Sequence, residues 1–572
     1  MFNSLSDEQK KIVFADLEKI VVRACPGSGK TFTVTARLAN KISKWEDRYI
    51  GIAALSFTNT AWQEIEKNLP KFECGPIKRP HFLGTIDSFI NNYIFLPFGH
   101  LVMGCEKRPK LVGEPHSKWS GRFYSEQWFD KSSFNINDEF IFTQKYPIPP
   151  TAKAAVVKAI KNKKMELISL GYANQHDANY FALKILKKYP EIAESLVARF
   201  PILLIDEAQD TTEIQMAIID ELVGAGLKEI LIVGDPDQAI FEWNDANPDL
   251  FVKKCSEWEL KQLEECRRSS QDICNFVHKL STLSAPARSV STEVATLGIK
   301  PDIIEYDNLL SIKNTFIKRC ESEDIPIKKE DVSILCRTKG AVNEVVNVFE
   351  GAPIVTGPTF FNDSDIWEER FIWCRDICEG LYLISKGEFK NGYRILERGC
   401  FKILNENHYS KENLRLHIKN IGLVNWRKFI NDIIVSAPDI SGDLSAYLSS
   451  FSPMAESFFN EMNILTAVKN NKKSLLIKDI FGISDADSKF SHLPIRLGTI
   501  HSVKGETFDA TLLILKNRIM NTKYQTILSR CKKDKLLEEE LRTLYVAMTR
   551  PRKILIIGVP QGDGNMWNAF LN

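Results

Sequence analysis

Short runs of consecutive apolar residues recur along the chain, and most of them end in a polar or glycine-containing segment. They lie at residues 20–22, 53–55, 202–205, 230–233, 332–335 and 554–557. Apolar runs of this length are typical of parallel strands that flanking helices bury on both faces of a sheet. The pattern therefore predicts an α/β fold built on parallel sheets.

Two long intervals between these runs are predicted to be mostly helical. Residues 89–196 and 386–489 contain few strand signals, and no repeat or low-complexity linker sets them apart. We therefore expect each interval to be a domain inserted into an α/β core. The expected division is a first core of residues 1–88 and 197–274 with insertion 89–196, and a second core of residues 275–385 and 490–572 with insertion 386–489.

Composition narrows the functional class only slightly. The 572 residues are too many for one hydrophobic core, and the net charge of +2 means that any nucleic-acid contact must be a local groove. The chain shows no signal peptide and no apolar run as long as a membrane span, so we expect a soluble cytoplasmic protein. Its 12 cysteines form no CxxC pair, which favours reduced thiols over disulfides or a zinc site.

A candidate phosphate-binding loop follows the first apolar run, in the segment RACPGSGKTFTV at residues 23–34. Glycines let backbone N–H groups approach phosphates, a lysine reaches the β- and γ-phosphates, and a hydroxyl binds Mg²⁺. Ala24 stands where the usual pattern has its first glycine. The residues expected to hold ATP and Mg²⁺ are Ala24, Gly27, Ser28, Gly29, Lys30 and Thr31.

Acidic and amide side chains follow two later apolar runs. In ILLIDEAQDTTEIQ, at residues 202–215, Asp206 is placed to bind Mg²⁺ and Glu207 to orient the attacking water. In VGDPDQAIFEW, at residues 233–243, Gln238 is placed to sense the γ-phosphate. Phe241 and Trp243 offer flat faces for stacking, although aromatic residues in such a position are also common in cores.

These motifs together resemble the superfamily-1 DNA helicases of the UvrD, Rep and PcrA type. Gln9, in LSDEQKKIV, is similar to the family's Q motif, which reads adenine. Segments similar to further motifs follow in the family's order: SFTNTAWQEI at 56–65, GTIDSF at 84–89, LEECRRSSQDI at 263–273, TFF at 359–361, TIHSVKGETFD at 499–509 and EEELRTLYVAMTRPRK at 538–553. The resemblance therefore covers nearly the whole chain.

The resemblance implies two RecA-like cores, 1A and 2A, with one nucleotide between them. The helical insertions then correspond to domains 1B and a reduced 2B. Arg268 and Arg550 match the family's arginine fingers, and Arg267 stands where an aromatic ring usually stacks on adenine. Single-stranded DNA is expected to cross both cores, at the matching positions Phe57, Asn59, Thr85, Phe241, Trp243 and His501. His501 could equally be a core histidine.

Several positions depart from the family's pattern. Thr60 replaces a lysine, Asn244 replaces an arginine, and Glu506 with Thr507 replaces a Leu-Glu pair. Together with Arg267, these departures put base selectivity and DNA affinity in doubt. A basic run in the first insertion is by default a solvated helix face, but it could instead touch duplex phosphates. It consists of Lys153, Lys158, Lys161, Lys163 and Lys164.

The expected activity is that of an ATP-dependent translocase or helicase that, by resemblance, moves 3′ to 5′ on single-stranded DNA. Two alternatives stay open: a DNA-gated ATPase switch that regulates a partner nuclease, and a solitary repair helicase. A fused helicase–nuclease is disfavoured because only about twenty residues follow the last motif. A small-molecule kinase would need neither Arg550 nor Trp243.

The prediction of a partner rests on two parts of the chain that are shorter than in housekeeping helicases. The second insertion is shorter than the regulatory domain of housekeeping helicases, and the tail after the last motif is short. In this the chain resembles the helicase-like subunits of bacterial anti-phage systems, most nearly the Gabija system. We therefore expect it to act on DNA ends beside a nuclease subunit, an ATPase–nuclease of the OLD family.

Overall fold

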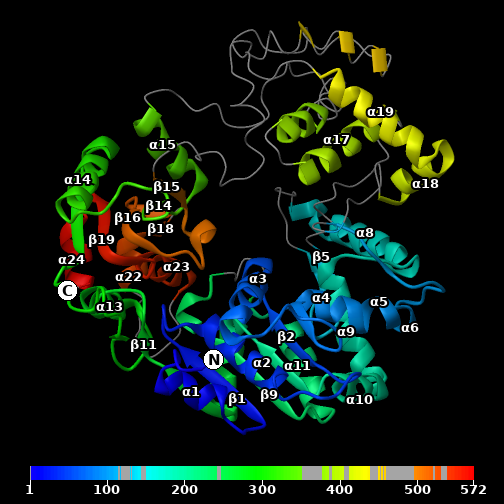
Figure 1. The fold of residues 1–572 in the computed structure, drawn as a ribbon, viewed down its shortest axis with the longest axis horizontal. Coiled ribbons are helices and arrows are strands. Elements are labelled where there is room, and N and C mark those ends of the chain that lie inside the picture. Colours follow the sequence, from blue (N-terminus) through cyan, green and yellow to red (C-terminus); the bar gives the residue numbers. More distant parts are fainter. Residues whose placement is uncertain are drawn as a thin grey trace. The chain divides into compact units, whose positions relative to one another are not determined.

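The protein divides into two compact units in the computed structural model, one of residues 1–342 and 495–572 and one of residues 343–494. Figure 1 labels their elements. The structure describes residues 2–113, 116, 129, 132–142, 150–240, 246–350, 376–385, 389–404, 411–437, 449–450, 453–454, 457–458, 495–519, 522–529 and 538–571.

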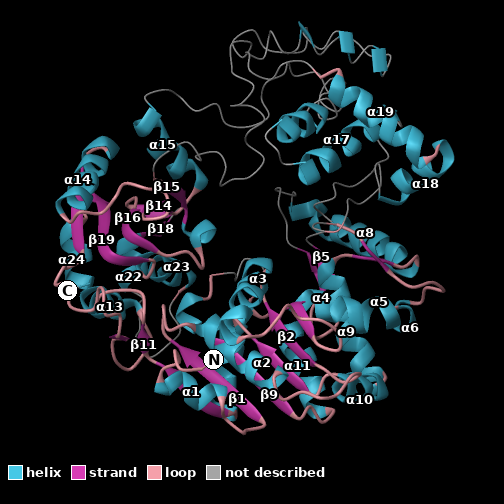
Figure 2. Cartoon of the chain, viewed as in Figure 1, coloured by secondary structure: helices cyan, strands magenta, loops and turns pink. Residues whose placement is uncertain are grey.

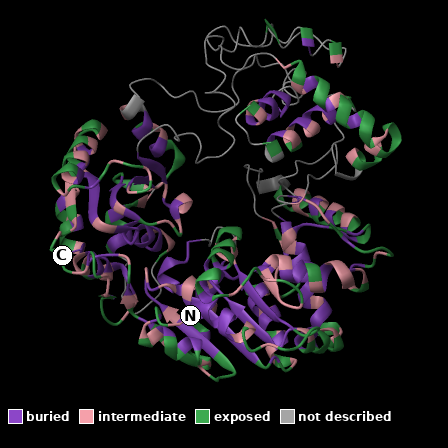
Figure 3. Cartoon of the chain, viewed as in Figure 1, coloured by how far each residue is buried: buried purple, intermediate pink, exposed green. Residues whose placement is uncertain are grey.

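The first sheet is parallel throughout, in the order β10-β1-β9-β8-β2-β3. Its strands are β1 (Lys19–Ala24), β2 (Ile52–Ser56), β3 (Phe82–Thr85), β8 (Ile202–Ile205), β9 (Glu229–Gly234) and β10 (Glu259–Leu263). Figure 2 shows helices around these strands, and Figure 3 shows the central strands of the sheet buried.

Alternate residues of β8 enter two different hydrophobic cores, which is why this central strand is apolar without interruption. Ile202 and Leu204 of β8 join a core with α1 (Asp7–Val13), α2 (Lys30–Ile42) and α3 (Asn59–Asn68), which cover one face. Leu203 and Ile205 join the core on the other face. The α/β class and the parallel sheets predicted from the apolar runs are therefore confirmed.

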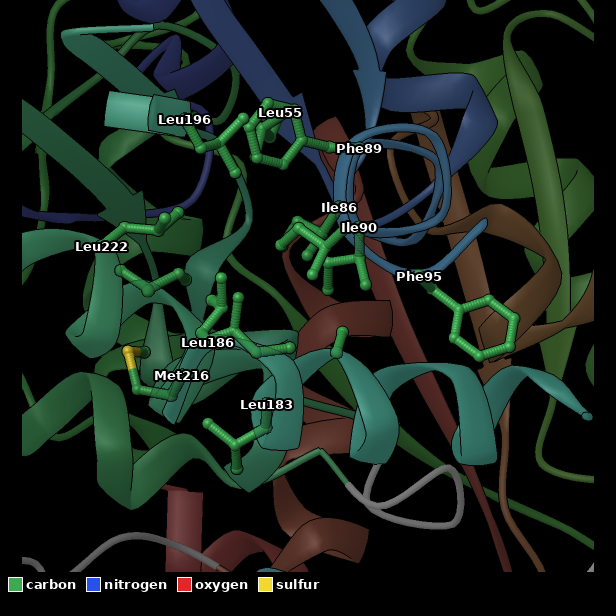
Figure 4. Close-up of a cluster of buried hydrophobic side chains, with 14 of the residues drawn as sticks. Leu55, Ile86, Phe89, Ile90, Phe95, Leu183, Leu186, Leu196, Met216 and Leu222 are labelled. Atoms are coloured by element: carbon green, nitrogen blue, oxygen red, sulfur yellow. The ribbon is translucent and has the colours of Figure 1, made fainter. Parts of the chain in front are cut away.

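The first insertion packs on the second face of this sheet. Its helices are α4 (Ile86–Ile90), the π-helix η2 (Asn91–Phe95), α5 (Leu96–Phe98), α6 (His100–Met103), α8 (Pro150–Ser169), α9 (Gln175–Lys188) and α10 (Pro190–Arg199). Figure 4 shows Phe89 and Ile90 facing the same cluster as Leu183 and Leu186 of α9. Met216 of α11 (Glu213–Gly224) closes that cluster, so the insertion shares one core with the sheet.

Short strands interrupt the helices of this insertion. β4 (Lys110–Leu111) pairs with β7 (Tyr172–Ala173), and β5 (Ser132–Phe134) pairs with β6 (Phe140–Phe142). The prediction of a mostly helical segment is thus right in its main content, but it missed these two small ladders.

A second parallel sheet has the order β13-β19-β16-β14-β15. Its strands are β13 (Asp302–Tyr306), β14 (Val332–Cys336), β15 (Arg496–Thr499), β16 (Phe508–Ile514) and β19 (Pro551–Pro560). The helices around it include α13 (Gln271–Val277), α14 (Leu309–Ser322), α22 (Tyr524–Ser529), α23 (Glu539–Met548) and α24 (Gly564–Leu571). Between the sheets in sequence, β11 (Glu265–Cys266) pairs with β12 (Arg288–Ser289).

The described part of the second unit is helical. It contains α17 (Phe389–Leu404), α18 (Lys411–Ile421) and α19 (Leu423–Val435), and the buried Trp426 of α19 donates a hydrogen bond to Glu397 of α17. The segment TFF at residues 359–361 lies outside the described residues. Among the helices of the described ranges, none is long and apolar enough to cross a membrane.

Candidate active site

The phosphate loop connects β1 to α2. Gly27 and Gly29 have φ values of +73° and +79°, a left-handed conformation that favours glycine, and Gly29 is the N-cap of α2. A Cβ on Gly27 would lie 2.7 Å from Cβ of Arg268, so only glycine fits there. The backbone N–H of Arg267 donates to the Gly27 carbonyl at 2.9 Å. The loop is therefore held open at a helix N-terminus, where backbone N–H groups bind phosphate.

Thr31 and Asp206 lie together below this loop. The Thr31 hydroxyl donates to Oδ2 of Asp206 at 2.7 Å, and Asp206 is fully buried at the end of β8. Burial and the neighbouring charge of Glu207 raise the pKa of Asp206. A hydroxyl beside a buried carboxylate is a hard oxygen donor set, which fits Mg²⁺.

Glu207 follows Asp206 in a left-handed conformation, with φ of 54°. Its Oε2 accepts a hydrogen bond of 2.7 Å from the Gln209 amide. Burial alone would raise the pKa of Glu207, but the cations Lys30 and Lys504 outweigh it and lower the pKa. The side chain is therefore ionised at neutral pH, as a carboxylate that takes a proton from water must be.

A buried chain of contacts joins the phosphate loop to the second sheet. Lys30 Nζ lies 3.9 Å from Oδ2 of Asp235, which accepts a 2.5 Å hydrogen bond from Gln238. Oε1 of Gln238 in turn accepts a 3.0 Å hydrogen bond from the guanidinium of Arg550. Burial and the nearby Arg268 lower the pKa of Arg550 to about 9, so it is still a cation at neutral pH.

The two neighbouring arginines after β11 have different environments. Arg268 enters the site and donates to the backbone carbonyl of Thr549 at 3.0 Å. Arg267 turns outward: its side chain is 40% exposed and lies 3.7 Å from the Glu265 carboxylate. The guanidinium plane of Arg267 is thus available at the surface beside the loop.

The side chain of Gln9 is buried against the same loop. Its Oε1 accepts from the Ser6 backbone at 3.1 Å, and its Nε2 donates to the Ser28 carbonyl at 3.2 Å. The Ser28 hydroxyl donates to the Cys25 carbonyl at 2.8 Å, and Ala24 is buried at the end of β1. Both ends of the Gln9 amide therefore bind backbone, and the residue supports the loop's shape.

Two charged residues within the motifs, Asp237 and Lys504, support the site although the sequence did not predict a role for them. Asp237, next to Gln238, accepts hydrogen bonds from the Ser281 hydroxyl at 2.8 Å and the Thr282 hydroxyl at 2.6 Å. The Thr282 hydroxyl also accepts from Arg23, in β1, at 2.5 Å. Lys504 forms an ion pair with Asp210. Both residues lie in polar segments, GDPDQ and HSVKGE, so no local signal marked them, although a charged group that becomes buried must find a partner.

The described positions of the expected DNA surface follow the ends of parallel strands. Phe57 comes after β2, Thr85 ends β3, and His501 comes after β15, in the short helix η10 (Ile500–Val503). Asn59 is exposed, whereas the Thr85 hydroxyl caps α4 by accepting from the Ser88 backbone at 3.0 Å. Burial lowers the pKa of the half-buried His501. Phe241, Trp243 and Asn244 lie outside the described residues.

The structure corrects one member of the basic run in the first insertion. Lys164 is fully buried, where its ammonium lies 2.9 Å from the buried carboxylate of Asp177 and donates to the Phe129 carbonyl. Lys164 is therefore a core residue and touches neither solvent nor phosphate. Lys153, Lys158 and Lys161 are exposed on α8, and Lys163 pairs with Glu166 at 2.7 Å.

Comparison with known proteins decides the family. A model of the UvrD/REP helicase N-terminal domain matches residues 5–108 and 124–258, and one of the UvrD-like helicase C-terminal domain matches residues 449–561. The chain belongs to the UvrD-like helicases. This assignment confirms the resemblance seen in the motifs and the enzyme class expected from it, that of the ATP-dependent DNA helicases.

Individual UvrD-like relatives are distant. The Gabija protein GajB of Bacillus cereus is 25% identical over 337 residues, which cover 58% of this chain and 60% of that protein. A probable DNA helicase II homolog of Mycoplasma genitalium is 22% identical, with 99% of this chain and 87% of that protein covered. The ATP-dependent DNA helicase PcrA of Staphylococcus aureus is 21% identical, with 100% and 86% covered.

Proposed function

We propose that this protein is a translocase that hydrolyses ATP to move 3′ to 5′ along single-stranded DNA. The observation that carries the proposal is a buried series of side-chain contacts. It runs from Lys30 through Asp235 and Gln238 to Arg550. A single nucleotide bound at these residues would contact both sheets. In the domain division predicted from the sequence, the two sheets belong to cores 1A and 2A. Loss of the γ-phosphate therefore changes how the cores are held together.

In this mechanism the chain's own residues bind the phosphates and move one proton. The Lys30 ammonium neutralises phosphate charge, and the Glu207 carboxylate orients the attacking water and accepts its proton. Arg550 and Arg268 stabilise charge on the transferred group. Thr31 and Asp206 would hold Mg²⁺, which supplies further charge neutralisation when it is bound.

The DNA surface in this proposal runs over the ends of the parallel strands. We assign Phe57 and His501 to stacking with bases, and Asn59 and Thr85 to contacts with the DNA backbone. Phe241 and Trp243, outside the described residues, are assigned to the same surface. Stacking is tolerant of sequence, so we expect a translocase without base preference.

The test separates hydrolysis from directed movement. ATP hydrolysis is measured with and without single-stranded DNA, and streptavidin displacement is measured from oligonucleotides that carry biotin at either end. The proposal requires DNA-stimulated hydrolysis and faster displacement from the 5′ end, toward which a 3′-to-5′ motor runs. Stimulated hydrolysis with no displacement from either end would favour the DNA-gated switch instead.

The match to GajB supports a second element of the proposal, a role in anti-phage defence beside a nuclease subunit. We infer a partner of the ATPase–nuclease class that acts at DNA ends. The test is purification from the native host with mass determination of the particle. A stable complex with a nuclease supports this role, whereas a chain that purifies alone from a locus without a nuclease gene indicates a solitary repair helicase.

A further inference from the structure

Three cysteines from separate parts of the chain lie together beneath the phosphate loop. Cys25 belongs to the loop itself, Cys266 ends β11, and Cys274 lies in α13. All three are buried in one cluster, and the side chains of Cys266 and Cys274 line the same small cavity. The two sulfur atoms are therefore already neighbours, as the formation of a bond between them requires.

Cys266 is also in contact with the machinery of the active site. Its Sγ accepts the backbone N–H of Ser269 at 3.4 Å, and a Cβ built on Gly27 would lie 3.0 Å from that sulfur. The next two residues along the chain are Arg267 and Arg268. Any covalent change at this sulfur therefore acts on the segment that carries Arg268 and binds Gly27.

A small cavity reaches both thiols. Its volume is about 20 Å³, and Cys266, Cys274, Pro26, Tyr545 and Thr549 line part of its wall. A space of about 10–15 Å³ by this measure holds a water molecule. The cavity can therefore admit a molecule as small as hydrogen peroxide to the sulfur atoms.

The surroundings favour the reactive form of one thiol. The hydrogen bond from Cys274 lowers the pKa of Cys266, and backbone N–H groups and the Arg268 guanidinium act in the same direction. Burial raises the pKa of Cys320, in α14, to about 12. Because the thiolate is the nucleophile, Cys266 is the more reactive of these two cysteines.

We propose that Cys266 and Cys274 form a peroxide-sensitive thiol pair that inhibits nucleotide hydrolysis when it is oxidised. The Cys266 thiolate attacks one oxygen of a hydroperoxide, whose O–O bond breaks. A sulfenic acid forms, and the leaving oxygen takes up a proton as water or an alcohol. The Cys274 thiol then attacks the Cys266 sulfur and forms the S–S bond, while its proton and the hydroxyl group of the sulfenic acid leave together as water. Two electrons pass from the thiols to the peroxide.

The disulfide weakens the Cys266 sulfur as the hydrogen-bond acceptor of the Ser269 N–H and ties β11 to α13. The segment between them carries Arg268, whose guanidinium binds the Thr549 carbonyl. An arginine finger contributes about 10³ to 10⁵ in kcat, so even a partial displacement should slow hydrolysis by more than about tenfold. This consequence rests on the proposed ATPase activity, whereas formation of the disulfide does not.

The experiment treats the full chain with hydrogen peroxide, alkylates the remaining thiols in denaturant and maps the peptides. We expect a peptide bridged between Cys266 and Cys274, lighter by two hydrogen atoms, in the wild type and in the control Cys320→Ala. The bridge should be absent from Cys274→Ser and Cys274→Ala, whose folding is checked by thermal melting. Hydrolysis should fall by more than about tenfold in the bridged protein and return after reduction.

Two results would overturn the proposal. One is the absence of this bridge, including the case in which Cys25 pairs instead. The other is a bridged protein that hydrolyses ATP at the rate of the reduced protein. If the reduced protein shows no hydrolysis at all, the proposed function fails, and the peptide map still decides whether the thiol pair exists.

Discussion

The ammonium of Lys504 lies 2.6 Å from the carboxylate of Asp210, and the two side chains are 13% and 1% exposed. Asp210 follows β8 of the first sheet, and Lys504 follows β15 of the second. This buried ion pair therefore joins elements of both sheets, near Glu207. Burial raises the pKa of Asp210 to about 6, although Lys504 opposes the shift.

The first prediction concerns the pH dependence of stability. An unfolded Asp has a pKa of about 3.9, so between about pH 4 and 6 the folded protein holds a proton that the unfolded chain has released. The contribution of Asp210 to the free energy of unfolding therefore falls as pH rises through this window and is constant above it. In Asp210→Asn, the fall in the free energy of unfolding between about pH 4 and 6 should therefore be smaller than in the wild type by up to about 2–3 kcal/mol.

Urea unfolding at several pH values between 4 and 7 measures this effect. Asp249→Asn, at an exposed position in α12 (Pro248–Glu257), is the matched control and should keep the wild-type slope. Identical slopes for Asp210→Asn and the wild type would show that Asp210 does not titrate in this range.

The second prediction tests the role of Glu207. Glu207→Gln keeps the size of the side chain but removes the carboxylate that accepts a proton. We expect kcat for ATP hydrolysis to fall by about 10² to 10⁴, with nucleotide binding retained. Steady-state hydrolysis and titration with a fluorescent ATP analogue measure the two effects. Glu213→Gln, exposed in α11, should be unaffected, and near-normal turnover in Glu207→Gln would mean that another group activates the water.

The third prediction compares two glycines with positive φ. Ala at Gly27 would place its Cβ 2.7 Å from Arg268, whereas Ala at Gly226, with φ of +94°, would meet nothing within 4 Å. Both substitutions should lower stability by about 1–2 kcal/mol because of the left-handed backbone. Only Gly27→Ala should also abolish nucleotide binding. Equal ATP affinity in both variants would argue against the close packing of Arg268 on the loop.

Base selectivity gives the fourth prediction. The Gln9 amide binds the backbone of Ser6 and Ser28. By the resemblance to the helicase motifs, Arg267 stands where a stacking ring is expected. We therefore expect GTP to be hydrolysed within about tenfold of ATP, a difference of about 1.4 kcal/mol. Gln9→Ala should raise KM for both nucleotides alike, because it loosens the loop rather than a base contact. A wild-type preference for ATP of several hundredfold would mean that a base-specific contact exists.

The fifth prediction separates two lysines of one helix. Lys164→Ala leaves Asp177 buried without its cation and should destabilise the first insertion by about 3–5 kcal/mol. Hydrogen exchange across α8 and α9 measures this loss. Lys158→Ala should leave hydrogen exchange unchanged. If α8 contacts duplex phosphates, this variant should also reduce the slope of log binding constant against log salt concentration by about one. Normal exchange in Lys164→Ala would contradict the buried ion pair.

The sequence predicted the central strands well and the edge strands poorly. β8 is apolar throughout, and β9 is apolar from Ile230 to Val233, because both of their faces are covered. At the sheet edges, β10 has the sequence ELKQL and β13 the sequence DIIEY, since edge strands are partly exposed and carry charge. Neither therefore shows the continuous apolar run on which the prediction relied.

The residues of the candidate site also differ in how well the sequence predicted them. Lys30, Thr31 and Asp206 lie in local motifs whose spacing indicates their chemistry. The contact of Gln238 with Arg550 was expected only as a shared nucleotide site, because 312 residues separate them and only the fold brings them together. The burial of Lys164 had no local signal at all, since its partner Asp177 lies in the following helix.

The position of β19 inside the second sheet has a consequence for the order of events during synthesis. Among the described residues, β13 pairs only with β19, which lies about 250 residues further along the chain. By contrast, the strands of the first sheet all lie before residue 264. Because domains generally fold as units while they emerge from the ribosome, the first sheet can form early, with the second still incomplete. During translation, residues 302–306 and 332–336 must both wait as unpaired strands until their partners are synthesised. Unpaired strands of this kind are prone to aggregate, so a chaperone can protect them.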